Sequence, residues 1–184
     1  MNYSTEGVTL YALFVNDILN LYKGKQEEFA PLFQIAEGYD LSDPFNKIPM
    51  QVYNDMCAWI ERELGTYSLI RVGRQISESV YNSLKANNVT NENSTPLDYM
   101  KALVYAASTM IQDPQGRGWE IVSHDKNSIV MRRTQTFNSK LQLGLLSGLV
   151  YKCKNVFGVT VDYLEKEADG AEYDIYIIRW TSMK

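Results

Sequence analysis

The one histidine of the chain, His124, is the first side chain to consider for chemistry. Catalytic triads, Cys–His pairs and multi-histidine metal sites would all have to use this residue. His124 ends an expected strand and is followed by the turn residues Asp125 and Lys126, where an imidazole is normally solvated. We therefore expect an exposed side chain with no catalytic role; ligation of a metal or haem by His124 is the alternative.

The other reactive groups are isolated from one another. Carboxylates are numerous but dispersed, whereas acid–base catalysis needs two of them in one cleft with separated pKa values. Cys57 and Cys153 form no Cys-x-x-Cys pair, and we expect two reduced, partly buried thiols. Gly116-Arg117-Gly118 precedes a strand and lacks the Lys-Ser/Thr ending of a phosphate loop. The sequence therefore predicts a protein that is not an enzyme and uses no cofactor and no metal.

Aromatic and arginine side chains are the candidates for binding. The chain has 13 tyrosines and 3 tryptophans, several on expected strand faces or helix stripes, and such side chains line many small-molecule sites. Arginines at 71, 74, 132 and 133 could meet an acidic group of a ligand. The residues that we expect to bind a ligand are Arg74, Trp119, Arg133 and Tyr151.

The first half of the chain has the periodicity of helices. These helices would help to position the candidate binding side chains. Apolar residues recur there at three- and four-residue spacing. We expect helices over 8–22, 27–36, 49–64 and 66–84, followed by an Asn-rich loop over 87–95. Thr95 should cap a further helix to Ile111, with Pro96 at its first position and Asp98 three residues after the cap.

The second half predicts two hairpins with a helix between them. Strands over 119–124 and 128–133 face each other across a turn, and strands over 159–164 and 173–180 meet near Asp169-Gly170. The helix over 137–154 has Gly144 and Gly148 one turn apart, a spacing typical of close packing. We therefore expect one α+β domain over 1–184, with a helical N-terminal half packed on a four-stranded antiparallel sheet built as hairpin-helix-hairpin.

Composition narrows the classes of partner. Hydrophobic residues make up 45% of the 184 positions, which suits one globular core. The net charge is -4, with both signs interspersed, and this disfavours nucleic acid. No apolar run approaches the roughly 20 residues of a membrane span, and the first residues lack the pattern of a secretory signal. We expect a cytoplasmic protein with no membrane span.

Several segments of the second half also resemble a known group of proteins. They are Gly118–Ile121, Phe137-Asn138, Leu143–Leu149 and Tyr173–Trp180. Together they resemble the haem-NO-binding-like (H-NOX-related) proteins, within the superfamily of NO-signalling and Golgi-transport ligand-binding domains. The resemblance implies helices packed on an antiparallel sheet, a ligand cavity between them, and sensory or scaffolding roles. Haem-binding members have a histidine on the helix before the sheet and a Tyr-x-Ser-x-Arg motif, and this chain has neither.

We therefore expect a small-molecule-binding sensory or signalling module that does not depend on haem in the usual way. Its apolar, aromatic pocket would lie between the second-half helices and the sheet, and occupancy would alter contact with a signalling protein partner. The alternative is a homodimeric interaction or scaffold domain without a ligand. A cofactor-free enzyme and a haem protein ligated through Tyr or Cys are further hypotheses. A solid interior near Trp119 and Tyr151 would contradict the first interpretation.

Overall fold

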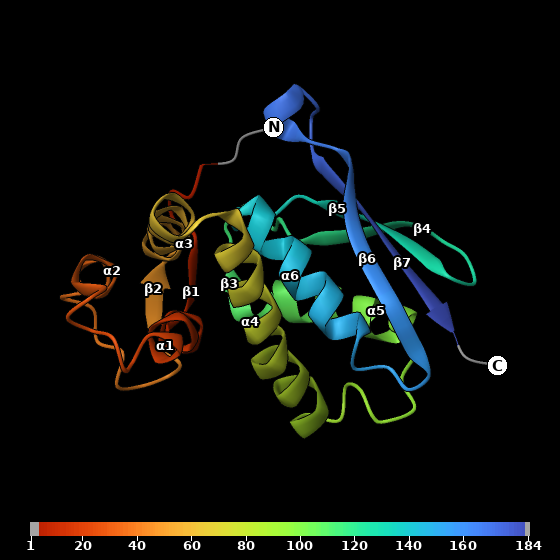
Figure 1. Ribbon diagram of the computed structural model, residues 1–184, viewed down its shortest axis with the longest axis horizontal. Coiled ribbons are helices and arrows are strands. Elements are labelled where there is room, and N and C mark those ends of the chain that lie inside the picture. The colour runs from red at the N-terminus through yellow and green to blue at the C-terminus, as the bar shows by residue number, and fades with distance from the viewer. Residues whose placement is uncertain (1–3, 183–184) are drawn as a thin grey trace.

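The computed structural model describes residues 4–182 and shows an α+β fold (Figure 1). The first part of the chain consists of helices and short strands: β1 (Thr9–Tyr11), α1 (Ala12–Leu21), α2 (Ala30–Ile35), β2 (Lys47–Pro49), α3 (Met50–Leu64), α4 (Thr66–Ala86), α5 (Pro96–Met110) and β3 (Ile111–Gln112). The second part follows: β4 (Trp119–His124), β5 (Ser128–Arg133), α6 (Ser139–Val150), β6 (Val156–Glu165), the 3-10 helix η1 (Glu167–Asp169) and β7 (Asp174–Ser182).

The second part is the predicted hairpin-helix-hairpin. Its four strands are all antiparallel, in the order β4-β5-β7-β6, so the two hairpins join through β5 and β7. Buried and more exposed side chains alternate along β5 and most of β7, and Met131, Tyr176 and Ile178 point to the buried face. Figure 1 shows α6 lying between this face and α4, while β1, β2 and α1 to α3 form the opposite side of the molecule. The four-stranded sheet and its helical cover are confirmed.

The first predicted helix begins later than expected. Residues 9–11 form β1 instead, which pairs antiparallel with β2 on one side and β3 on the other. Leu10 lies opposite Ile48 and Ile111, and all three side chains are buried. The pairing joins segments far apart in the chain, so this small sheet overrides the local helical periodicity of 8–11, and the prediction of a helix from Val8 was wrong.

Three other predicted helices are shorter in the structure than expected. Helix α2 covers 30–35 and not 27–36, and α6 covers 139–150 and not 137–154. Pro49 is the last residue of β2 and precedes α3. The connection between β6 and β7 is longer than a tight turn, because η1 intervenes before Gly170 adopts a left-handed conformation with φ +96°. The capping box at Thr95 is confirmed, with Asp98 bonded to Thr95 in both directions.

The crossing of α4 and α6 is unusually close, as predicted from Gly144 and Gly148. A methyl group on Gly144 would overlap the carbonyl oxygen of Ile70 and lie 2.8 Å from the amide nitrogen of Arg74. On α4, a methyl group on Gly73 would meet the backbone of Leu141 in the same way. The two helices therefore touch backbone to backbone, which fixes their separation.

Candidate functional site

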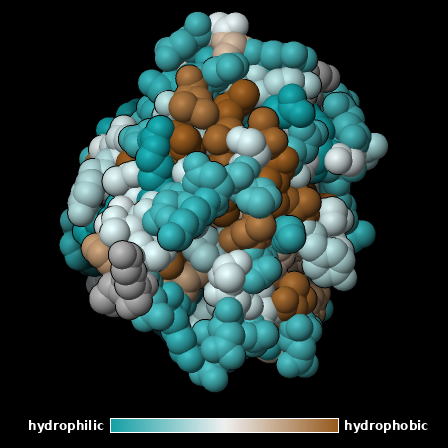
Figure 2. Space-filling view, turned by 90° about the vertical axis from the view of Figure 1, so that its right-hand side faces the viewer, coloured by the Kyte–Doolittle hydropathy of each residue, from teal (hydrophilic) through white to brown (hydrophobic). Residues whose placement is uncertain are grey.

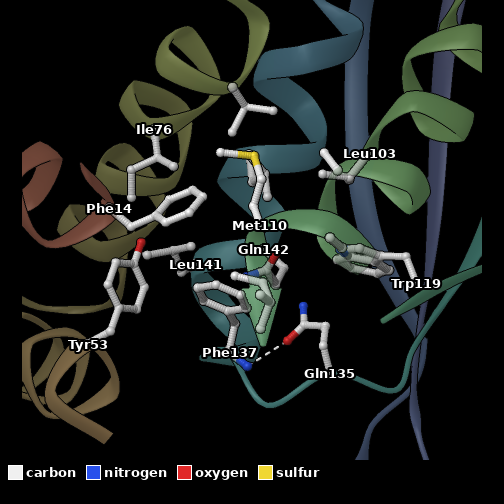
Figure 3. A pocket seen from close by; sticks show the side chains of 15 residues that line it. Phe14, Tyr53, Ile76, Leu103, Met110, Trp119, Gln135, Phe137, Leu141 and Gln142 are labelled. Atoms are coloured by element: carbon white, nitrogen blue, oxygen red, sulfur yellow. Dashed lines mark hydrogen bonds between the residues drawn. The ribbon is translucent and has the colours of Figure 1, made fainter. Parts of the chain in front are cut away.

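A cavity of about 50 Å³ lies where α4, α5, α6, α1, α3 and the start of β4 converge (Figure 3). Most of the side chains around it are apolar or aromatic. Its lining is Phe14, Tyr53, Ile76, Val80, Leu103, Ala106, Ala107, Met110, Ile111, Trp119, Gln135, Phe137, Leu141, Gln142 and Leu145. Both parts of the chain therefore contribute to the cavity wall, the helical part and the segments around the sheet.

Aromatic rings define one end of this cavity. Phe137 packs edge to face against Phe14 and Tyr53, with ring centroids 6.3 and 5.2 Å apart. Trp119 packs against Tyr176 of β7 at 5.6 Å. Such edge-to-face pairs are favourable beyond the area they bury, so the rings form a firm wall.

Two glutamine amides interrupt the apolar lining. Gln135 and Gln142 are 2% and 1% exposed, and each has one polar atom without a hydrogen-bond partner, Nε2 of Gln135 and Oε1 of Gln142. Figure 3 shows the Gln135 nitrogen pointing away from the Phe137 backbone, toward the side of the cavity where Gln142 and Trp119 lie. A donor and an acceptor therefore face one small, otherwise apolar space.

The segment that carries Gln135 is clamped by a buried arginine. Arg133 donates to the carbonyl oxygens of Gln135 and Phe137, at 2.8 Å each, and to the Asp174 carboxylate of β7. Asn54 of α3 donates to the carbonyl oxygen of Thr136 at 2.7 Å. Residues 135–137 are thus held from both sides, which fixes the direction of the Gln135 amide.

Asp174 is the ionic partner at the base of this clamp. Burial raises the pKa of its carboxyl group, but a hydrogen bond from Ser139 and the positive charge of Arg133 outweigh burial and hold the pKa below its usual value. Glu167 lies 3.7 Å from the same guanidinium group and is partly exposed. The clamp therefore runs from the cavity loop to the tip of the β6–β7 hairpin.

The four residues expected to bind a ligand lie in different places. Trp119 is buried and lines the cavity, and Arg133 lies behind the loop that carries Gln135 and Phe137. Arg74 is exposed on α4, with its Nε 3.5 Å from the Ser147 hydroxyl. Tyr151 follows α6 and is 50% exposed. The structure brings Trp119 and Arg133 to the same region, whereas Arg74 and Tyr151 lie outside the cavity lining.

Two of the remaining candidates for chemistry, His124 and Cys153, line the same open surface pocket. His124 is exposed, as predicted, and Cys57 and Cys153 are free and buried. Burial raises the pKa of the Cys153 thiol to about 12, so it is protonated at neutral pH. Within residues 4–182, no group of three or more His, Cys, Asp and Glu side chains is placed to hold a metal ion. No helix of the same range is long and apolar enough to cross a membrane.

Haem, the group that the sequence resemblance raises, does not fit the residues of this cavity. An engineered cavity that accepts benzene measures about 150 Å³, whereas this one measures about 50 Å³ and a porphyrin is larger than benzene. Tyr53 and Met110 are the lining side chains of axial-ligand type. Burial raises the pKa of Tyr53 well above its usual value and so disfavours a phenolate ligand, and the lining contains no cation to pair with propionates.

Sequence reasoning missed the two glutamines. The sequence does contain a signal for Gln142, because it is the one amide in the apolar run from Leu141 to Val150. Gln135 carries none, since it follows a strand in a polar segment where an exposed glutamine is ordinary. Its role depends on the clamp by Arg133, which the sequence does not reveal.

Comparison with protein-family models and with curated proteins gives no match. Solved structures do match over nearly the whole chain. A Fe(II) unliganded H-NOX protein from K. algicida is 11% identical, covering 95% of this chain and 98% of its own, with a TM-score of 0.64. A mutant H-NOX domain from Shewanella oneidensis, in the Fe(II)CO ligation state, is 10% identical, covering 92% and 98%, with a TM-score of 0.68. These similarities over both chains show that this chain has an H-NOX-like fold.

Proposed function

We propose that this domain is a sensory module that binds a small molecule without haem. The observation that carries the proposal is the cavity between α4, α5, α6 and Trp119, which is lined mostly by apolar and aromatic side chains. Concave apolar sites with a few fixed polar groups are the usual form of a small-molecule site. Its size limits the ligand to a few non-hydrogen atoms.

The proposal for signalling rests on the loop that forms part of the cavity wall. Phe137 and Gln135 contact the cavity, and their carbonyl oxygens both accept hydrogen bonds from Arg133. A ligand that displaces this loop shifts the acceptors of Arg133, and with them its contacts to Asp174 and Glu167. The change would reach the β6–β7 hairpin, where a signalling partner could detect it. A ligand acts in this way only if it prefers one loop position.

The solved relatives give context for this proposal. The Shewanella oneidensis structures are of Fe(II) ligation states with CO and NO. The cavity of the present chain lacks the volume and the ligands for haem, so we propose that the same fold here binds its ligand directly. We also propose a cytoplasmic location and a single domain.

Xenon is the probe that tests the cavity. Amide proton–nitrogen correlation spectra of the full chain under xenon pressure should shift at the residues around Ala106, Leu145 and Trp119. Ala106→Leu places its larger side chain into the cavity and should abolish these shifts. Ser108→Leu, on the exposed side of the same helix, is the matched control and should retain them. Equal shifts in both variants, or none in the wild type, would overturn the proposal.

A titration with haem tests the other half of the proposal. We expect no stoichiometric binding of haem, and hence no shift of the Soret band that saturates at one haem per chain. The cavity offers neither room nor a suitable ligand set. A stoichiometric Soret band that disappears in the Ala106→Leu variant would show that haem enters after all.

The outer face of the four-stranded sheet favours the second candidate, a homodimeric scaffold. Figure 2 shows apolar side chains among hydrophilic ones on the side of the molecule where this sheet lies. Val130 lies opposite Ile177 in the middle of the sheet, and Val122 of β4 is 51% exposed. Two ion pairs lie on strands of the same sheet, Glu120 with Arg132 and Asp162 with Arg179. A second copy turned by a two-fold axis could match apolar to apolar and cation to anion.

Sedimentation equilibrium separates the two candidates. A dimer that dissociates in a Val130→Glu variant supports the scaffold, and a monomer at all concentrations contradicts it. The xenon result does not depend on this outcome, so the two functions are tested separately.

A further inference from the structure

We infer that Gln135 and Gln142 form a polar subsite for a small neutral molecule with a hydroxyl or carboxamide group. The inference deepens the proposed function and rests on it, because it names the chemistry of the ligand for the same cavity. It stands on two amides that are almost fully buried, have an unpartnered atom each, and line one cavity.

The orientation of the Gln135 amide is set by its backbone neighbour. Its Oε1 accepts a hydrogen bond from the Phe137 amide at 2.5 Å. An amide group facing an N–H must present its oxygen there, so the NH₂ end necessarily faces the opposite way. That end is the unpartnered Nε2, which lines the cavity as a donor.

The position of Gln142 is set by its helix. The residue lies in the first half of α6, between the cavity-lining Leu141 and Leu145, and its Oε1 has no partner. Because the helix is held against α4 by Gly144, the side chain cannot reach solvent without unpacking that crossing. The Gln142 side chain therefore stays in the cavity wall, where its unpartnered Oε1 can accept a hydrogen bond.

Unpartnered buried amides are costly, which is why the pair calls for an explanation. A buried donor or acceptor without a partner costs about 1–3 kcal/mol, and most such groups in proteins are satisfied. Leucine has a similar size and would suit the apolar surroundings of Gln142 without this cost. A bound group that accepts from Gln135 and donates to Gln142 removes both deficits at once.

Charge and size define the ligand class. The lining contains no ionised side chain, so a charged ligand would lose its hydration without compensation. The volume of about 50 Å³ is suited to a molecule of a few non-hydrogen atoms. A hydroxyl group can accept and donate with one oxygen, and a carboxamide can do so with two atoms. Short-chain alcohols and primary amides meet all of these requirements.

Acetamide and isopropanol are the probes that test the subsite, with xenon as the apolar reference. We expect both to bind the wild type, with shifts of the side-chain NH₂ signals of Gln135 and Gln142 in amide correlation spectra. Gln142→Leu should weaken acetamide binding about tenfold, the factor expected for one lost hydrogen bond, and leave xenon binding in place. Gln75→Leu, an exposed glutamine on α4, is the matched control and should bind both probes as the wild type does.

Stability gives a second measurement that does not need the ligand. Without a probe, Gln142→Leu should raise the melting temperature by about 3 °C, because it removes an unpartnered acceptor. Gln135→Leu tests the donor, although it also removes the bond to the Phe137 amide. Its acetamide binding should fall as in Gln142→Leu.

The outcomes separate this inference from the proposed function. If xenon binds and acetamide and isopropanol do not, the cavity is a site for apolar molecules and the polar subsite is refuted. If Gln142→Leu binds acetamide as tightly as the wild type does, the subsite is also refuted. If no probe enters, including xenon, the proposed function fails together with it.

Discussion

The two sides of α6 are built in opposite ways. Toward α4, Gly144 and Gly148 bring the helix so close that an added methyl group would overlap its neighbour. Toward α5, Leu141, Gln142 and Leu145 border a cavity of about 50 Å³. One helix thus has a side with no room for a carbon atom and a side that leaves space and unpartnered polar atoms.

The contrast explains how the cavity persists. Cores normally pack densely, and neighbouring elements relax into empty space. Here Ile76 of α4 and Leu145 of α6 form part of the cavity wall, yet the helices cannot move closer because their backbones already touch. The close crossing therefore works as a fixed spacer for the cavity beside it. Changes on the two sides should have effects of different sign and size.

The largest effect should come from the clamp below the cavity. Asp174→Asn removes the charge that faces the buried Arg133 guanidinium, and both side chains are almost fully buried. Breaking a buried pair by removing one partner costs several kcal/mol, so we expect a loss of about 3 kcal/mol in the free energy of unfolding. Urea unfolding followed by circular dichroism measures it. A loss below about 1 kcal/mol, the size of an exposed pair, would show that the clamp does not hold the cavity loop.

A smaller loss should follow from a methyl group on the close side. Gly144→Ala would normally favour a helix, but here the methyl group meets the backbone of Ile70 and Arg74, which cannot rotate away. Overpacking of this kind costs about 1–3 kcal/mol, and we expect about 2 kcal/mol by urea unfolding. Gly24→Ala has open space around it and should be close to neutral. If Gly144→Ala and Gly24→Ala are equally stable, the close crossing of α4 and α6 does not act as a fixed spacer.

The close side of α6 could be predicted from the sequence, and the small N-terminal sheet could not. Gly144 and Gly148 stand one helical turn apart, and that spacing is a local signal for close packing. The β1 strand has three residues, and its partners are 47–49 and 111–112. Pairing between such distant segments leaves no local pattern, so the helical spacing from Val8 predicted the wrong element.

The side of α6 that borders the cavity could be predicted only in part. Trp119 was expected at a ligand site and does line the cavity. Ala106 and Met110 lie on an apolar helix stripe, and a stripe looks the same whether its side chains fill a core or border a cavity. The difference arises because α4 and α6 cannot approach further, which is a property of the packed backbone and not of any local segment.

Filling the cavity beside α6 should raise the free energy of unfolding instead of lowering it. Ala106→Leu places three further carbon atoms toward the cavity and should raise the free energy of unfolding by about 1 kcal/mol, as cavity-filling changes commonly do. Thermal unfolding of the variant and of Ser108→Leu measures the difference. A destabilised Ala106→Leu would mean that the hollow side is as tightly packed as the close side, and the contrast between them would be lost.

The smallest effect should appear in acid. The pKa of Asp174 in the folded protein lies below its ordinary value of 3.8, so the unfolded chain takes up this proton at a higher pH than the folded chain does. The stabilisation is therefore complete above the ordinary value and is lost as the pH falls through the folded pKa. Thermal unfolding from about pH 6 to about pH 2 should show the gap between the wild type and Asp174→Asn narrowing in this acidic range, since Asn does not titrate. A gap that stays constant would show that the charge of Asp174 contributes nothing and that its hydrogen bonds alone hold Arg133 in place.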